Sequence, residues 1–265
     1  MTCVQGGGSC CCRLCRRTRA LGVEFRELNG RDEDLDEALR IYEESFGNSP
    51  ASIPVEFLRG IIGRRAGPRL AVLRDGVVVA MTIFARLDRG SIIWYLAVDY
   101  RYRRRGLGSQ LVKSVSNVLS GEVKAGPEAF LYAEFEDKIV PFWKANGFYV
   151  LPIRYYQPPM RGEWVRLNLG VLPLLPRSSL TSSAVRDFIY EIYTTVYKVK
   201  DLNDEHVRQV LEDCSRLGEL TFNLTRRGEY AYRPRRALMH EDIGGFMGLW
   251  EHGRQVHVRR LQGRS

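Results

Sequence analysis

The sequence predicts a mixed α/β fold in which helices cover both faces of a partly open, mixed β-sheet. Apolar runs of strand length alternate with amphipathic patterns of helix length between residues 23 and 171. The pair Asp75-Gly76 separates two apolar runs, and this pair favours the tight turn of a β-hairpin. An antiparallel meander followed by strand–helix–strand crossovers produces a sheet of this kind.

The expected elements follow one another closely along this region. Each helix pattern places apolar residues three or four positions apart, and each strand pattern alternates or runs apolar. Pro141 suits the first turn of the last helix, and Asn146 and Gly147 suit its C-terminal cap. Strands are expected at 23–28, 69–73, 77–84, 91–98, 129–135 and 163–171, and helices at 32–46, 55–62, 107–119 and 140–145.

We expect three parts: a flexible tail rich in Cys, Gly and Arg at 1–20, a main domain at 21–172, and a helical extension at 173–265. Prolines 173 and 176 mark the second boundary. Apolar residues at helical spacing predict a helical hairpin from two helices, at 185–197 and 204–217. We expect this hairpin to pack against the main domain or against a second copy in a homodimer; a lid or partner-binding module is the alternative. Residues 221–265 show weak periodicity and are expected to be irregular and basic.

The net charge of +9 arises from 34 arginines and 6 lysines against 31 acidic residues. Positive potential attracts an anionic cofactor or a nucleic acid, but no nucleic-acid-binding motif accompanies it, so we favour a solvated basic surface. No apolar run approaches the roughly 18 residues of a membrane span, and residues 10–17 are too polar for a signal peptide. We therefore expect a cytoplasmic protein without membrane contact.

Five of the six cysteines lie within the first 15 residues. Cys10, Cys11 and Cys12 are adjacent, and adjacent thiols do not readily converge on one tetrahedral ion. No histidine lies nearby and no second C-x-x-C follows, so we predict no metal site.

An arginine- and glycine-rich turn joins the strand at 91–98 to the helix that starts near 107. Gly106 and Gly108 allow a ligand to approach the backbone, and the first amides of the helix attract an anion. Together with the neighbouring arginines, these features predict a pyrophosphate-binding turn. No lysine follows Gly108, which excludes a P-loop, and Leu111 replaces the third glycine of a dinucleotide-binding fingerprint. A solvated arginine cluster on a tight turn is the remaining alternative.

Four segments resemble the GCN5-related N-acetyltransferase (GNAT) superfamily, over about residues 23–170. Residues 103–108 match its R/Q-x-x-G-x-G/A signature, and residues 96–99 (Leu-Ala-Val-Asp) resemble the strand end before it. Residues 141–148 resemble its F-Y-x-x-x-G-F segment, and residues 155–159 a Y-x-Q-P-P stretch of one bacterial subgroup. The resemblance implies a GNAT-like sheet and an enzyme that uses acetyl-CoA.

The resemblance also implies a cofactor site. Backbone groups at the end of the strand would hold the pantetheine arm, amides of the turn would hold the diphosphate, and the acetyl group would lie between the strands at 91–98 and 129–135. Many members have a tyrosine where Trp143 stands. Because an indole cannot act as an acid, Trp143 is expected to line the cofactor channel. The residues expected to bind the cofactor are Leu96, Ala97, Val98, Arg103, Arg104, Arg105, Gly106, Leu107, Gly108, Ser109 and Trp143.

The catalytic groups are less evident. All four histidines lie beyond residue 200, so the general base is expected to be a carboxylate. Glu134 and Glu136 at the end of one strand are the candidates, and they face the same way because side chains alternate with period two. Tyr95, Tyr132, Tyr149 or water are the alternatives for the general acid.

The predicted function is transfer of an acetyl group from acetyl-CoA to a primary amine of a small molecule or peptide. Because Trp143 replaces the tyrosine, a catalytically idle acyl-CoA-binding or regulatory module is one alternative. An adaptor that acts through the basic C-terminal extension is another. The acceptor is not evident, since the loops that bind it vary with function.

Overall fold

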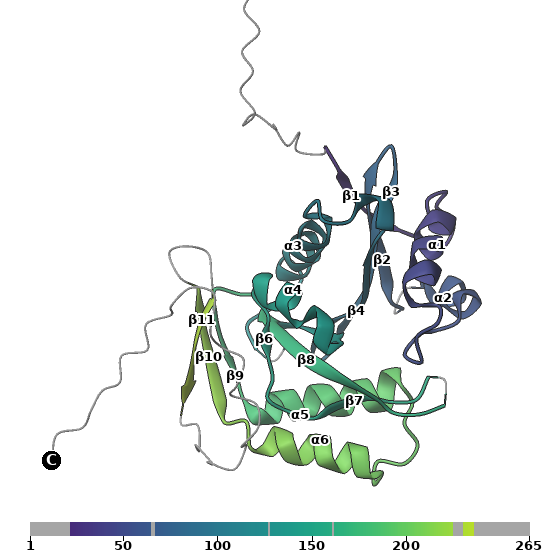
Figure 1. The fold of residues 1–265 in the computed structure, drawn as a ribbon. Helices are drawn as coiled ribbons and strands as arrows, with labels where there is room; N and C mark the ends of the chain where they lie inside the picture. The colour runs from purple at the N-terminus through teal and green to yellow at the C-terminus, as the bar shows by residue number, and fades with distance from the viewer. Residues whose placement is uncertain (1–21, 65–66, 127, 161, 225–229, 236–265) are drawn as a thin grey trace, which may run out of the picture.

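The computed structural model describes residues 22–64, 67–126, 128–160, 162–224 and 230–235 (Figure 1). Eight strands of these residues form one sheet, in the order β1-β2-β3-β4-β5-β8-β6, and β7 pairs with the other part of β8. The predicted mixed α/β class is confirmed. The strands are β1 (Glu24–Leu28), β2 (Arg69–Asp75), β3 (Val77–Leu87), β4 (Gly90–Val98), β5 (Phe130–Phe135), β6 (Tyr149–Val150), β7 (Tyr155–Gln157) and β8 (Val165–Pro173).

The sheet divides where β4 meets β5. Strands β1 to β4 are antiparallel neighbours, as expected of hairpins, whereas β4 and β5 run parallel. Their pairing covers only Ser91 to Ile93 of β4, after which the two strands diverge. This divergence opens a gap beside the C-terminal half of β4, next to the arginine-rich turn.

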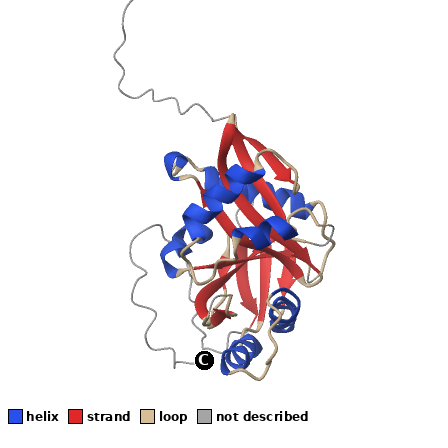
Figure 2. Cartoon of the chain, turned by 90° about the vertical axis from the view of Figure 1, so that its right-hand side faces the viewer, coloured by secondary structure: helices blue, strands red, loops and turns tan. Residues whose placement is uncertain are grey.

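Helices cover both faces of the sheet (Figures 1 and 2). Apolar residues of α1 and α2 pack on one face of β2 to β4, and those of α3 and α4 pack on the other face. In α3, for example, Leu111, Val115 and Leu119 recur every four residues and are all buried. The helices are α1 (Leu35–Phe46), α2 (Val55–Ile61), α3 (Leu107–Ser120) and α4 (Val140–Ala145), with short 3₁₀ helices η1 (Tyr100–Tyr102) and η2 (Asp137–Ile139).

The C-terminal extension packs against the main sheet and shares a hydrophobic core with it. It contains β9 (Arg177–Leu180), α5 (Ser182–Glu191), a π-helical turn η3 (Ile192–Val196), α6 (Glu205–Ser215), β10 (Glu219–Leu224) and β11 (Tyr230–Arg235). The ring of Tyr132 on β5 stacks on Phe188 of α5 with centroids 3.7 Å apart. On β3, Ile83 packs with α1 whereas Ala85 packs with the extension. Residues two apart on a strand share a face, so the extension lies beside α1 and α2 on the same face.

Several expectations are met and others are corrected. The expected helical hairpin is present as α5 and α6, and it packs against the eight-stranded sheet. The segment expected to be irregular contains β10 and β11, which form a second sheet with β9. The short strands β6 and β7 were not expected. The cysteine-rich tail and most of the basic C-terminus lie outside the described residues. Within the described part, no helix is long and apolar enough to cross a membrane.

Candidate active site

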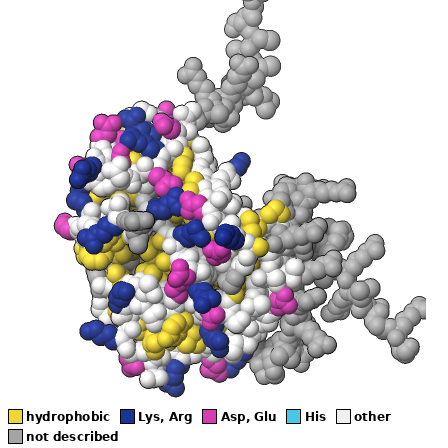
Figure 3. Space-filling model, turned by 180° about the vertical axis from the view of Figure 1, so that it is seen from behind, with side chains coloured by type: hydrophobic (Ala, Val, Ile, Leu, Met, Phe, Trp, Pro, Cys, Tyr) yellow, Lys and Arg dark blue, Asp and Glu magenta, His cyan; other side chains and the backbone are white. Residues whose placement is uncertain are grey.

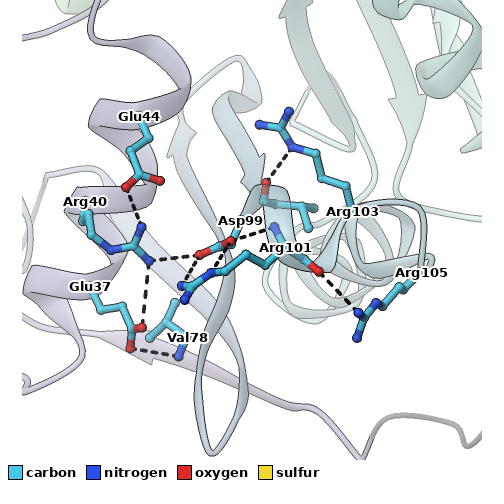
Figure 4. A network of polar contacts seen from close by, with 9 residues as sticks. Glu37, Arg40, Glu44, Val78, Asp99, Arg101, Arg103 and Arg105 are labelled. Carbon is cyan, nitrogen blue, oxygen red and sulfur yellow. Dashed lines mark hydrogen bonds and ion pairs between the residues drawn. The ribbon is translucent and has the colours of Figure 1, made fainter.

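Asp99, directly after β4, is the buried centre of the arginine-rich turn (Figure 4). Its carboxylate accepts hydrogen bonds from Nη2 of Arg101 at 2.7 Å and from Nη2 of Arg40 on α1 at 3.0 Å. The bonds from Arg101 hold the pKa of Asp99 well below its ordinary value, against the effect of burial. Two arginines are thus committed to Asp99, and the turn has a fixed internal anchor.

The turn itself fits a bound diphosphate. Gly106 has φ of 80°, which favours glycine, while a Cβ at Gly108 would lie 3.1 Å from the ring of Phe142. The first intrahelical bond of α3 runs from Gln110 N to Gly106 O, so the preceding amides lack helical partners. No acidic residue stands in the first turn of α3. The expected set of Arg103, Arg104, Arg105, Leu107 and Ser109 surrounds this helix start, with the three arginines exposed.

The backbone of β4 offers further binding groups. Asp99 N donates to Val79 O of β3 at 3.0 Å, and alternation therefore directs the peptide groups of Leu96 and Val98 away from β3. They face the side from which β5 has diverged, and Arg103 Nε donates to Val98 O at 3.1 Å. Ala97, by the same alternation, directs its peptide groups to β3. Leu96 and Val98 thus fit an extended arm such as pantetheine.

A β-bulge in β4 lies just before the residues that border the gap. Tyr95 pairs with Ile83 and Ile93 pairs with Phe84, which leaves Trp94 as the extra residue. Because the bulge interrupts the alternation, Trp94 and Tyr95 both line one cavity. This cavity has a volume of about 930 Å³ and is bounded by the α1–α2 region, by the ends of β3 to β5, and by the extension.

Glu134, near the end of β5, lies at this cavity and is held by two tyrosines. Tyr155 of β7 donates its hydroxyl to Oε1 at 2.5 Å, and Tyr197, just after η3, donates to Oε2 at 2.7 Å. Burial raises the pKa of Glu134 to about 7, although both hydrogen bonds oppose this increase. A carboxylate with a pKa near neutrality is suited to accept a proton from a reacting group.

Two other predicted site residues, Glu136 and Trp143, make no contact with the hydrogen bonds between Glu134 and its two tyrosines. Glu136 also lines the cavity, but it is exposed and pairs with Nζ of Lys138 at 2.6 Å. Trp143 is buried on α4, between Phe135 and Phe148, with ring centroids at 5.3 and 4.8 Å. Its place beside the cofactor channel stays a prediction.

Of the three tyrosines considered as acids, only Tyr95 lines the cavity. Its hydroxyl donates to Ala51 O at 2.6 Å, and burial raises its pKa. Tyr132 is fully buried beneath α5, and Tyr149 is half-buried near Phe222.

Sequence reasoning missed both tyrosines that bind Glu134. Tyr155 belongs to the segment that resembles Y-x-Q-P-P, and this resemblance was the only signal for it. The sequence places Tyr197 in the apolar stripe of the helix expected at 185–197, which predicts a packing role for it. The π-helical turn at Ile192–Val196 changes the direction of this stripe and brings Tyr197 to β5. No three metal-ligating side chains gather among the described residues.

Comparison with known proteins agrees with this geometry. Residues 35–148 match the model of the Acetyltransferase (GNAT) family. A protein from Bacteroides thetaiotaomicron assigned to the GNAT family is 18% identical, with a TM-score of 0.55, over 67% of this chain and 99% of that chain. Ard1 from Thermoplasma volcanium is 20% identical over 58% and 98% of the two chains, with a TM-score of 0.46. A search among curated protein sequences found no match.

The matched segment contains the arginine-glycine turn, the gap between β4 and β5, and Glu134. The first of these structures supports the fold, since its TM-score exceeds 0.5. The family match and the fold agree with the resemblance of the sequence motifs. Residues 35–148 match the family over the whole of this segment and form a GNAT acetyltransferase domain.

Proposed function

We propose that the protein transfers the acetyl group of acetyl-CoA to a primary amine that binds in the cavity beside Glu134. The observation that carries this proposal is a half-buried carboxylate that two tyrosine hydroxyls hold at a cavity beside the open gap between β4 and β5. Burial raises the pKa of this carboxylate to about 7, which suits a general base. Bound acetyl-CoA would supply the acetyl group as an activated thioester.

Glu134 acts as the general base. A primary amine has a pKa of about 10 and is protonated at neutral pH, so it must lose a proton before it can attack a carbonyl carbon. The carboxylate of Glu134 accepts this proton directly or through a water molecule. Tyr155 and Tyr197 hold both of its oxygens, which orients the carboxylate and favours its ionised form.

The turn after β4 binds the cofactor. The amides at the start of α3 and the exposed Arg103, Arg104 and Arg105 fit a diphosphate. Asp99 keeps Arg101 and Arg40 in place behind the turn and so positions its backbone. Cofactor and amine then approach the gap from different sides, with Glu134 on the amine side.

Two measurements test the proposal. We expect isothermal titration to show binding of acetyl-CoA, and a panel of amines to release free CoA in its presence. Glu134→Gln should retain cofactor binding and lower turnover by about 10² to 10⁴, the contribution typical of a general base. Binding without release of CoA for any amine would favour an idle acyl-CoA-binding module. Failure to bind acetyl-CoA would contradict both functions.

A further inference from the structure

The cavity beside Glu134 has a largely apolar lining. Its walls include Phe46 and Ile53 from the α1–α2 region, Trp94 and Tyr95 from β4, and Leu167 from β8. Seen from behind, hydrophobic side chains gather on the side of the molecule that carries α1 and α2, with basic side chains among them (Figure 3).

Two large apolar side chains of the lining are exposed to solvent. Phe57 of α2 is 57% exposed and Ile139 is 39% exposed, and both line the cavity. Together with the apolar walls they form an exposed apolar surface at the cavity, and such surfaces mark ligand-binding grooves. This surface suits an acceptor whose main body is apolar or aromatic.

The described lining has few carboxylates that can bind the ammonium groups of an acceptor. Only Glu134 and Glu136 contribute carboxylates among the described lining residues, and Glu136 already pairs with Lys138. Glu134 accepts two hydrogen bonds, but a carboxylate has about four acceptor positions, so one ammonium group can still bind there. Each further ammonium group of a polyamine or aminoglycoside would lose hydration and find no second unpaired carboxylate among the described lining residues. The cavity suits one ammonium group.

The described lining also carries two cationic side chains that form no ion pair with a described residue. Arg64 and Lys198 both line the cavity, are exposed, and make no ion pair with any described residue. The other two arginines of the lining are engaged: Arg69 pairs with Glu27 and Glu122, and Arg86 pairs with Glu128.

Lys198 has an unusual backbone. Its φ of 54° lies in the left-handed region, which is unfavourable for a residue other than glycine. It directly follows Tyr197, whose hydroxyl binds Glu134. The strained residue therefore places a cationic side chain at the cavity, on the segment that also holds the carboxylate.

We propose that the acceptor is a monoamine whose apolar or aromatic body ends in a carboxylate. Its ammonium group would bind at Glu134, its body would cover the apolar walls, and its carboxylate would meet Lys198 and Arg64. This inference rests on the proposed acetyl transfer and specifies its substrate class.

Four amines with acetyl-CoA and the full chain provide the test. They are 4-(2-aminoethyl)benzoate, its neutral analogue 4-(2-aminoethyl)benzamide, spermidine and kanamycin. We expect kcat/KM to be highest for the benzoate and lowest for the two polycations. Isothermal titration without cofactor should show the same order of binding, which provides a readout independent of turnover.

The variant Lys198→Gln tests the anionic end. It retains most of the side-chain length and removes the charge, so the ratio of kcat/KM for benzoate to benzamide should fall about fivefold, as expected of one partly exposed ion pair. The matched control Lys200→Gln replaces an exposed lysine outside the lining and should leave this ratio unchanged.

The outcomes separate this inference from the proposed function. Turnover that favours spermidine or kanamycin, or a benzoate-to-benzamide ratio near one that Lys198→Gln does not alter, overturns the inference and leaves acetyl transfer intact. Absence of turnover with every amine overturns both. A benzoate preference that falls in Lys198→Gln and persists in Lys200→Gln supports the inference.

Discussion

The hydroxyl of Tyr197 controls the protonation of Glu134, and the variant Tyr197→Phe tests this role. In the native protein, burial raises the pKa of Glu134 to about 7 while hydrogen bonds from Tyr155 and Tyr197 lower it. Removal of the Tyr197 hydroxyl eliminates one bond to the charged form and leaves the burial in place. The pKa of Glu134 should therefore rise.

The size of this increase follows from the strength of the lost bond. A hydrogen bond to a charged group contributes about 1.5–3 kcal/mol, and one pKa unit corresponds to about 1.36 kcal/mol. The pKa should rise by about 1 to 2 units, which places it at about 8 to 9. At pH 7 the ionised fraction of Glu134, and with it kcat/KM, should fall about 5-fold to 50-fold, and activity should recover at higher pH.

Two measurements follow the shift. The pH dependence of kcat/KM, with one amine for both proteins, reports the change in the enzyme, and carbon NMR of labelled glutamate reports the titration of Glu134 directly. Tyr190→Phe is the matched control, because Tyr190 is an exposed tyrosine on α5. A folded Tyr197→Phe protein in which Glu134 titrates within about 0.3 units of its native midpoint would refute the reasoning, since the expected shift is several times larger.

Three further predictions concern stability and the cofactor turn. The pKa of Glu134 in the folded protein, about 7, exceeds its ordinary value of 4.5, so the native state binds more protons than the unfolded state and the free energy of unfolding falls by up to about 3 kcal/mol as the pH rises from 4.5 to 7. Urea unfolding should therefore show that the native protein loses stability relative to Glu134→Gln between pH 5 and pH 8, and an equal difference between the two proteins at both pH values would contradict this prediction. Asp99→Asn removes the charge that holds Arg40 and Arg101, so calorimetry should show a lower Tm and isothermal titration about tenfold weaker binding of acetyl-CoA. An unchanged affinity for acetyl-CoA would exclude a role of Asp99 in positioning the turn. Gly108→Ala should lower Tm because its Cβ contacts the ring of Phe142, and the second substitution Phe142→Leu should restore Tm. Gly106→Ala should lower Tm because φ of 80° strains the backbone, so Phe142→Leu should not restore it. Equal recovery of Tm in both double variants would contradict these separate causes.

Local patterns predicted most of the fold. The helix α4 begins and ends at the expected residues, and β4, α3 and the hairpin of β2 and β3 lie close to their expected bounds. The two-residue strand β6 and the three-residue strand β7 are too short to show a period. In β10, however, Leu220, Phe222 and Leu224 alternate, and this signal was present in a segment expected to be irregular.

The candidate site was predicted less completely than the fold. Glu134 could be proposed because it ends a strand beside the gap, and its position needs only the strand pattern. The hydroxyls of Tyr155 and Tyr197 reach it from residues 21 and 63 positions further along the chain, and no spacing rule connects them. The charge of Asp99 was likewise visible, but its pairing with Arg40 depends on how α1 packs beside β4.

Departures from regular structure create the site. The bulge at Trp94 places two consecutive aromatic side chains at one cavity, and the divergence of β5 frees the peptide groups of Leu96 and Val98. The π-helical turn Ile192–Val196 brings Tyr197 to Glu134, so the extension completes the protonation environment of a carboxylate that lies in the GNAT domain. A truncated chain that ends before this turn would keep the carboxylate but lose one of its two hydrogen-bond donors. The extension is therefore part of the proposed catalytic unit, and the protonation of Glu134 depends on both segments.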